Sequence, residues 1–129
     1  MLVLMRLFAL LVLLFTVHAA QATCMFARDT KPQEWYEWAT VLVAGDVATV
    51  EQRGSIDVVS LRVVEAYKGP AGVQTATLEI PQKLWATCRI ARPSVGDHVL
   101  GALNANSDAL LVPLTEAYAE RLRAIKGKN

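Results

Sequence analysis

The sequence predicts a mainly β protein, with five short strands closed as a small Greek-key barrel and a helix at the C-terminal end. Three observations predict it. Five short runs are rich in β-branched residues or alternate between apolar and polar residues. Glycine occurs inside some of these runs, as at bends and bulges. Helical patterning is confined to a short segment before the first strand and to the last residues of the chain.

Before the strands, the chain opens with the pattern of a secretory signal peptide. Arg6 precedes an apolar run at 7–17, and Ala20-Gln21-Ala22 fits the small-x-small rule for cleavage. We expect cleavage after Ala22, with cleavage after Ala20 as the near alternative; an uncleaved anchor and a lipoprotein are the other readings. The run is short for a membrane span. The protein is therefore predicted to be periplasmic or secreted, touching the membrane only through residues 1–22 before cleavage.

Residues 23–129 form the predicted domain, whose charge is balanced. The whole chain has 13 basic and 12 acidic residues, and removal of the signal removes one basic residue, Arg6. The remaining net charge is zero, with no basic stripe to hold phosphates, so we expect no nucleic-acid partner. No cofactor is predicted, because the sequence contains no phosphate-binding loop or zinc-binding motif.

Two cysteines, Cys24 and Cys88, lie beyond the signal, and a pair in an exported chain predicts a disulfide. The bond would close a loop of about 65 residues, worth roughly 4 kcal/mol on the chain-entropy model. It would also hold the N-terminal end of the mature chain against the domain.

The elements follow in order. Pro32 at an early helical position predicts a short helix, and Trp35 and Trp38, three residues apart, share one of its faces. The expected strands are 40–50, with a bend at Gly45, then 56–67, 73–80, 97–103 and 109–113. A turn at 52–55 joins the first two as a hairpin. A longer connection at 81–96 follows the third strand, and Thr115 is expected to be the N-cap or a first-turn residue of the last helix.

Alternation places Val59, Leu61, Val63 and Tyr67 on one face of the second strand, with Lys68 at the solvent edge. In the last helix, Ala117, Tyr118, Leu122 and Ile125 are expected to share an apolar face. Five strands suit a barrel of the oligonucleotide/oligosaccharide-binding (OB) type. A β-sandwich is the alternative, although it usually needs about seven strands.

Several motifs, taken together in their order, resemble the netrin-like family, and in particular bacterial proteins similar to tissue inhibitors of metalloproteinases. The motifs are VAGDV at 43–47, YKG at 67–69, Cys88, and GDHVL at 96–100. The resemblance covers most of residues 24–113. It implies the same five-stranded OB barrel with a terminal helix, and it agrees with one disulfide.

The same resemblance raises metalloproteinase inhibition as an alternative function. Animal members of the family chelate the zinc of the protease through an N-terminal cysteine, whereas Cys24 follows Thr23 in this chain. The second early cysteine of those proteins is also absent, since Met25 and Phe26 follow Cys24. The resemblance therefore supports the fold, and inhibition would have to act through the N-terminal edge in another way.

Candidate sites are few. His98 is the only histidine beyond the signal, so no histidine-rich metal site is expected. In an alternating strand a histidine more often faces solvent, although a small envelope enzyme pairing His98 with a carboxylate is a second reading. No catalytic residue is predicted.

The aromatic residues are the most suggestive feature. Trp35, Trp38 and Trp85 could dock a protein or glycan. The favoured alternative is that Trp35 and Trp38 cover an open end of the barrel, because so small a domain needs aromatic core. The predicted binding surface combines these tryptophans with the segment 23–30, which follows the signal peptide, and with the loop that contains Cys88. Its residues are Cys24, Met25, Phe26, Trp35, Trp38, Trp85 and Arg89. We expect an exported, non-catalytic module that binds an envelope or extracellular protein; a glycan-binding module is a further alternative.

Overall fold

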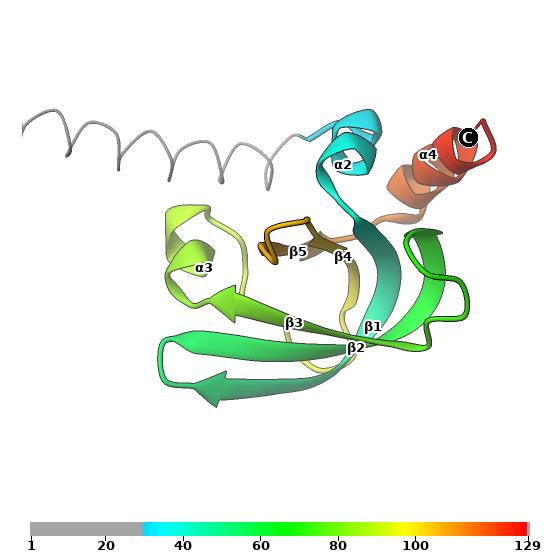
Figure 1. Ribbon diagram of the computed structural model, residues 1–129. Coiled ribbons are helices and arrows are strands. Elements are labelled where there is room, and N and C mark those ends of the chain that lie inside the picture. Colours follow the sequence, from blue (N-terminus) through cyan, green and yellow to red (C-terminus); the bar gives the residue numbers. More distant parts are fainter. Residues whose placement is uncertain (1–29, 129) are drawn as a thin grey trace, which may run out of the picture.

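The computed structural model describes residues 30–128. The predicted signal peptide and the candidate residues Cys24, Met25 and Phe26 lie outside the described residues. Figure 1 shows a curled sheet with α2 and α4 together at one end and α3 at the other. The elements are α2 (Pro32–Trp38), β1 (Val41–Arg53), β2 (Ile56–Lys68), β3 (Thr75–Pro81), α3 (Lys83–Thr87), β4 (His98–Leu103), β5 (Ala109–Pro113) and α4 (Glu116–Lys126).

One antiparallel sheet holds all five strands, in the order β3-β2-β1-β4-β5. β1 and β2 form a long hairpin, joined by a two-residue turn in which Gly54 has a φ of 57°. β4 pairs with β1 only along 41–46, and β3 pairs with β2 only along 56–62. The two ends of the hairpin therefore have different neighbours, which allows the sheet to curl over itself.

Irregular pairing bends the hairpin. The register between β1 and β2 shifts at three places, one of them between Ala44 and Gly45. A Cβ on Gly45 would lie 2.7 Å from the carbonyl oxygen of Arg62, so the two strands approach too closely for any larger residue. The predicted bend at Gly45 is confirmed, and β-bulges of this kind increase local twist.

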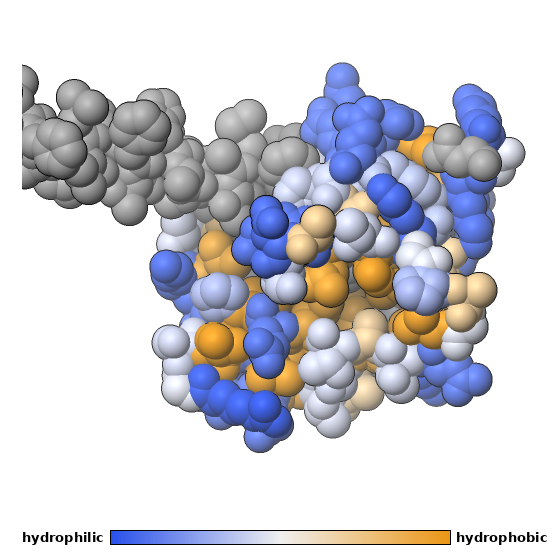
Figure 2. Space-filling view, viewed as in Figure 1, coloured by the Kyte–Doolittle hydropathy of each residue, from blue (hydrophilic) through white to orange (hydrophobic). Residues whose placement is uncertain are grey.

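The predicted number and antiparallel arrangement of the strands are confirmed, but the sheet is not closed into a barrel. In the part of the chain that the structure describes, no ladder joins β3 to β5. Both edge strands are short and end in proline, at Pro81 and Pro113, which lacks a donor for a further hydrogen bond. Leu78 and Leu111 instead pack in one core across this opening. Figure 2 shows apolar surface gathered in this part of the view, between β3 and β5.

Two cores use opposite faces of the sheet. In β4, Leu100 and Ala102 face a core shared with α2 and α4, whereas Val99 faces a core shared with β2 and β3. Gly101 lies on this second side, where a Cβ would come within 2.8 Å of Leu61 and 3.0 Å of Leu78. The sheet is thus covered on both faces near β4, and the cores together support one domain.

Local signals were good guides to the ends of elements. The predicted strand 109–113 and the short helix at Pro32 are confirmed, and Thr115 caps α4 by accepting a hydrogen bond from the amide of Tyr118. Two expectations were wrong. The connection 81–96 contains a short helix, α3, and Ala117 is exposed while Ala119 is buried in its place.

Candidate functional site

The predicted aromatic surface is mostly interior. Trp35 is 2% exposed and Trp85 is 9% exposed. Trp38 is partly buried and meets Trp35 edge to face, with ring centroids 6.1 Å apart. Trp35 and Trp38 thus pack with α4 at one end of the sheet, which is a core position but not the end of a closed barrel. Arg89 is the exposed member of the predicted set among the described residues.

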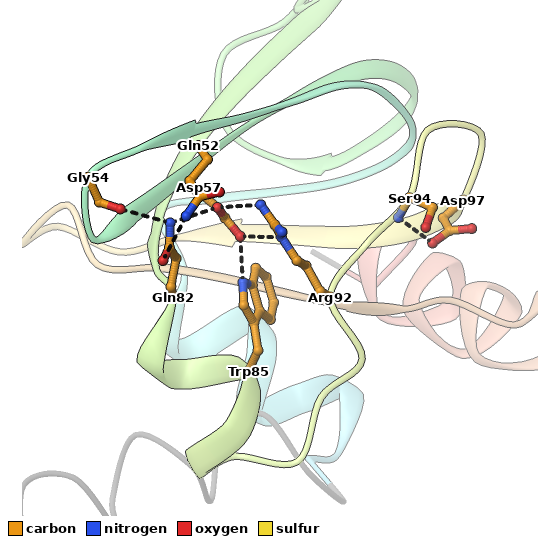
Figure 3. Close-up of polar contacts among 8 residues, drawn as sticks. All are labelled: Gln52, Gly54, Asp57, Gln82, Trp85, Arg92, Ser94 and Asp97. Atoms are coloured by element: carbon orange, nitrogen blue, oxygen red, sulfur yellow. Dashed lines mark hydrogen bonds and ion pairs between the residues drawn. The ribbon is translucent and has the colours of Figure 1, made fainter.

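Trp85 belongs to a buried polar cluster centred on Asp57, drawn in Figure 3. The Asp57 side chain is 0% exposed, and Trp85 Nε1 donates to its Oδ2 over 2.8 Å. Arg92 donates to both carboxylate oxygens, with Nε and Nη2 each at 2.8 Å, and Gln82 adds a hydrogen bond of 3.2 Å. Every neighbour of the carboxylate is therefore a donor, which is what a buried charge requires.

These donors decide the ionisation of Asp57. Burial acts to raise its pKa, and the hydrogen bonds from Trp85 and Arg92 outweigh burial, so the pKa lies below its ordinary value. The carboxylate is ionised at neutral pH and joins the start of β2 to the connection between β3 and β4.

Sequence reasoning missed Asp57, although a signal was present. Asp57 has the same parity as Val59 and Leu61, so strand alternation places it on the buried face. A charge on such a face needs partners, and Trp85 and Arg92 are potential donors in the connection. The guanidinium of Arg92 binds Asp57, although the arginine side chain itself is half exposed.

The loop that follows α3 carries Cys88 and Arg89. Cys88 is 2% exposed, and the described residues contain no free cysteine. The predicted pairing with Cys24 lies outside the described residues. Arg89 has a φ of 54°, a left-handed conformation that usually belongs to glycine after a helix. The amide of Ile90 donates to the carbonyl oxygen of Trp85 over 2.9 Å, which ties this turn to the buried cluster.

His98 does meet a carboxylate. Its Nδ1 lies 2.9 Å from Asp46 Oδ1, and Arg62 Nη2 donates to the other oxygen of Asp46 over 3.2 Å. The hydrogen bond with His98, followed by that from Arg62, lowers the pKa of Asp46. The side chain of His98 is 42% exposed. Among residues 30–128 its ring has no other hydrogen-bond partner, so no nucleophile is aligned on it.

The end of β2 forms a pocket with α2 and α4, of about 600 Å³. Tyr36 and Tyr67 are buried residues of its lining, and Lys68 and Lys126 are exposed ones. The hydroxyl of Tyr67 donates to Glu65, and burial followed by the charge of Glu65 raises the pKa of this phenol. Tyr67 is buried and Lys68 is exposed, as expected. The expectation that Tyr67 shares a face with Val59 and Leu61 was wrong, because the register of β2 shifts near Tyr67, which packs in the core with α2 and α4.

Two further properties bear on function. The described part of the chain has no group of three or more side chains that would hold a metal ion. None of its helices is long and apolar enough to cross a membrane.

Comparison with models of known protein families gave no match, and comparison with curated protein sequences gave none either.

Proposed function

We propose that this protein is an exported, non-catalytic binding module of the netrin-like OB type, with its signal peptide removed and Cys24 bonded to Cys88. The strand order, with β1 central and the edges β3 and β5 near each other, agrees with a partly open five-stranded Greek-key barrel. A buried Cys88, in a region without a free thiol, agrees with the disulfide.

A non-catalytic role is supported by the way the polar groups are used. The carboxylate oxygens of Asp57 accept hydrogen bonds from Trp85, Arg92 and Gln82. The carboxylate is fully buried, so a substrate cannot reach it. His98 and Asp46 are the remaining pair with acid–base potential. Both lie on one face of the sheet, where Arg62 also donates a hydrogen bond to the carboxylate of Asp46. Among the described residues, no nucleophile is hydrogen-bonded to the His98 ring.

The observation that carries the proposed surface is the conformation of Arg89. A left-handed backbone costs a non-glycine residue of order 1 kcal/mol, and such strain persists where the surroundings impose it. Here the turn follows α3 and is joined to Trp85 of the Asp57 cluster by the amide of Ile90, and the arginine on it is exposed beside Cys88. Arginine is enriched at protein interfaces because it combines charge with a broad planar donor group.

The test replaces Arg89 with glycine, which suits the left-handed turn and removes the side chain. We expect Arg89→Gly to keep or raise the melting temperature and to abolish capture of a partner from the exported protein fraction. Arg121→Ala, which changes an exposed arginine on α4, is the matched control and should capture as the wild type does.

The follow-up measures the affinity of the purified captured partner. If Arg89→Gly binds it as tightly as the wild type does, the Arg89 turn is not the surface. If the wild-type protein captures no partner at all, the protein-binding proposal itself fails.

A further inference from the structure

The pocket between α2, the end of β2 and α4 is separate from the Arg89 turn. Its six lining residues are Gln33, Tyr36, Glu37, Tyr67, Lys68 and Lys126. The two tyrosines are 6% and 4% exposed, so they are the buried members of the lining. The other four residues are exposed and form its polar rim.

Main-chain carbonyl oxygens hold both lysines of the rim. Lys68 Nζ donates to the carbonyl oxygen of Tyr36 and Lys126 Nζ donates to that of Ala66, each over 2.6 Å. These bonds fix the two ammonium groups without neutralising them. An ammonium has three donors, so each lysine keeps donors for another acceptor.

The acidic groups nearby are engaged elsewhere. Glu65 accepts two hydrogen bonds from Arg123 Nε, both of 2.9 Å, and one from Tyr67. Glu37 accepts from Gln33 over 3.4 Å. Within the described residues neither lysine forms a direct ion pair, and the charge of Lys126 acts on Glu65 only from a distance. The lining thus combines two positive charges with a single carboxylate, that of Glu37.

A pocket lined by two lysine ammonium groups and two tyrosines suits a particular ligand chemistry. A carboxylate accepts hydrogen bonds from ammonium groups, and an apolar group attached to it can contact the tyrosines. We propose that this pocket binds a carboxylate carried on an apolar or aromatic group. A free aromatic acid and the C-terminal end of a peptide with an apolar last residue share this chemistry.

The experiment titrates the protein with benzoate and follows backbone amide resonances by NMR. We expect saturable shifts at the amides of Glu37, Lys68 and Gly69, whereas benzamide, its neutral analogue, should bind at least about fivefold more weakly. Lys68→Gln and Lys126→Gln keep a donor for the carbonyl oxygens and remove the charge. Each should weaken benzoate binding about fivefold, as expected for one unit charge near the ligand in a water-like dielectric.

Lys83→Gln, an exposed lysine on α3, is the matched control and should bind benzoate as the wild type does. Melting curves of the variants establish that they are folded. A peptide ending in phenylalanine, with a free or an amidated C-terminus, distinguishes the sources. Competition by the free form alone assigns a peptide end, and no competition by either form assigns a free acid.

The proposal is overturned if benzoate leaves the pocket amides unshifted, if benzamide binds as well as benzoate, or if both folded lysine variants bind benzoate as the wild type does. Arg89→Gly should leave benzoate binding unchanged, so this test succeeds or fails independently of the proposed protein-binding surface.

Discussion

Two aspartates of the β1–β2 hairpin have similar partners and opposite surroundings. Asp57 is bound by Arg92 and the indole of Trp85, and Asp46 is bound by Arg62 and the imidazole of His98. The Asp57 side chain is 0% exposed, whereas the Asp46 side chain is 32% exposed. Hydrogen bonds lower the pKa of both carboxylates.

The difference teaches that the same contacts carry different weight according to burial. In an exposed ion pair, each charged group gives up interactions with water that are about as strong as those it gains, so the pair contributes little to the free energy of unfolding. A buried carboxylate is not reached by water. If its hydrogen-bond partners are removed, the cost of its desolvation is no longer offset, and the folded state is destabilised. The Asp57 cluster is therefore expected to hold the α3 connection in place, and the Asp46 cluster to be nearly dispensable for folding.

The largest expected effect comes from Asp57→Asn. The amide places a donor where Arg92 requires an acceptor and leaves a guanidinium without its partner. We expect a loss of about 3 kcal/mol in the free energy of unfolding, measured by urea denaturation. Asp46→Asn is the matched control. Equal losses in the two variants would contradict the role assigned to burial.

The next effect comes from Arg92→Ala, which leaves the charge of Asp57 buried with Trp85 and Gln82 as partners. We expect a loss of about 2 kcal/mol in the free energy of unfolding. Arg62→Ala removes the corresponding partner of Asp46, a side chain that is 75% exposed, and should melt close to the wild type. A larger loss in Arg62→Ala than in Arg92→Ala would reverse the comparison.

A smaller effect concerns acid unfolding. The folded pKa of Asp57 is lowered, so its contribution to stability is present above the pKa of an unfolded aspartate, near 4, and is lost as pH falls through the folded value. Between pH 7 and pH 3 the stability of Asp57→Asn should therefore fall less steeply than that of the wild type. Circular dichroism melts across this range measure both slopes. Parallel slopes would show that Asp57 has the same pKa in the folded and unfolded chains.

The smallest effect is expected for His98→Gln, which keeps a donor for Asp46 on the exposed sheet face. We expect a change in melting temperature of no more than about 3 °C. If this variant instead abolishes an activity that the wild-type protein shows toward an ester, glycoside or peptide substrate while remaining folded, the non-catalytic proposal is wrong.

Prediction from sequence succeeded where the cause is local. The bend at Gly45, the strand 109–113 and the cap at Thr115 each follow from a few neighbouring residues, and the structure has all three. Prediction of the site succeeded less well. Trp85 was weighed as an aromatic contact, and the partner that explains its burial, Asp57, is 28 residues away in the chain.

The pocket lies beyond local signals for the same reason. Nothing near Lys68 in the sequence indicates that its ammonium group meets the carbonyl oxygen of Tyr36, 32 residues earlier, or that Lys126 completes the rim from the last helix. The export signal, the disulfide with Cys24 and the resemblance to the netrin-like family stay predictions.

The sequence by itself determined the number of strands, most of their ends and the alternation that assigns each strand two faces. These properties depend on residue type and on spacing within about ten positions. Only the tertiary structure decided that the sheet stays open between β3 and β5, that Asp57 is buried while Asp46 is partly exposed, and that two lysines and two tyrosines line one pocket. Each of these features depends on contacts between segments that are far apart in the sequence, and local residue patterns do not determine such contacts.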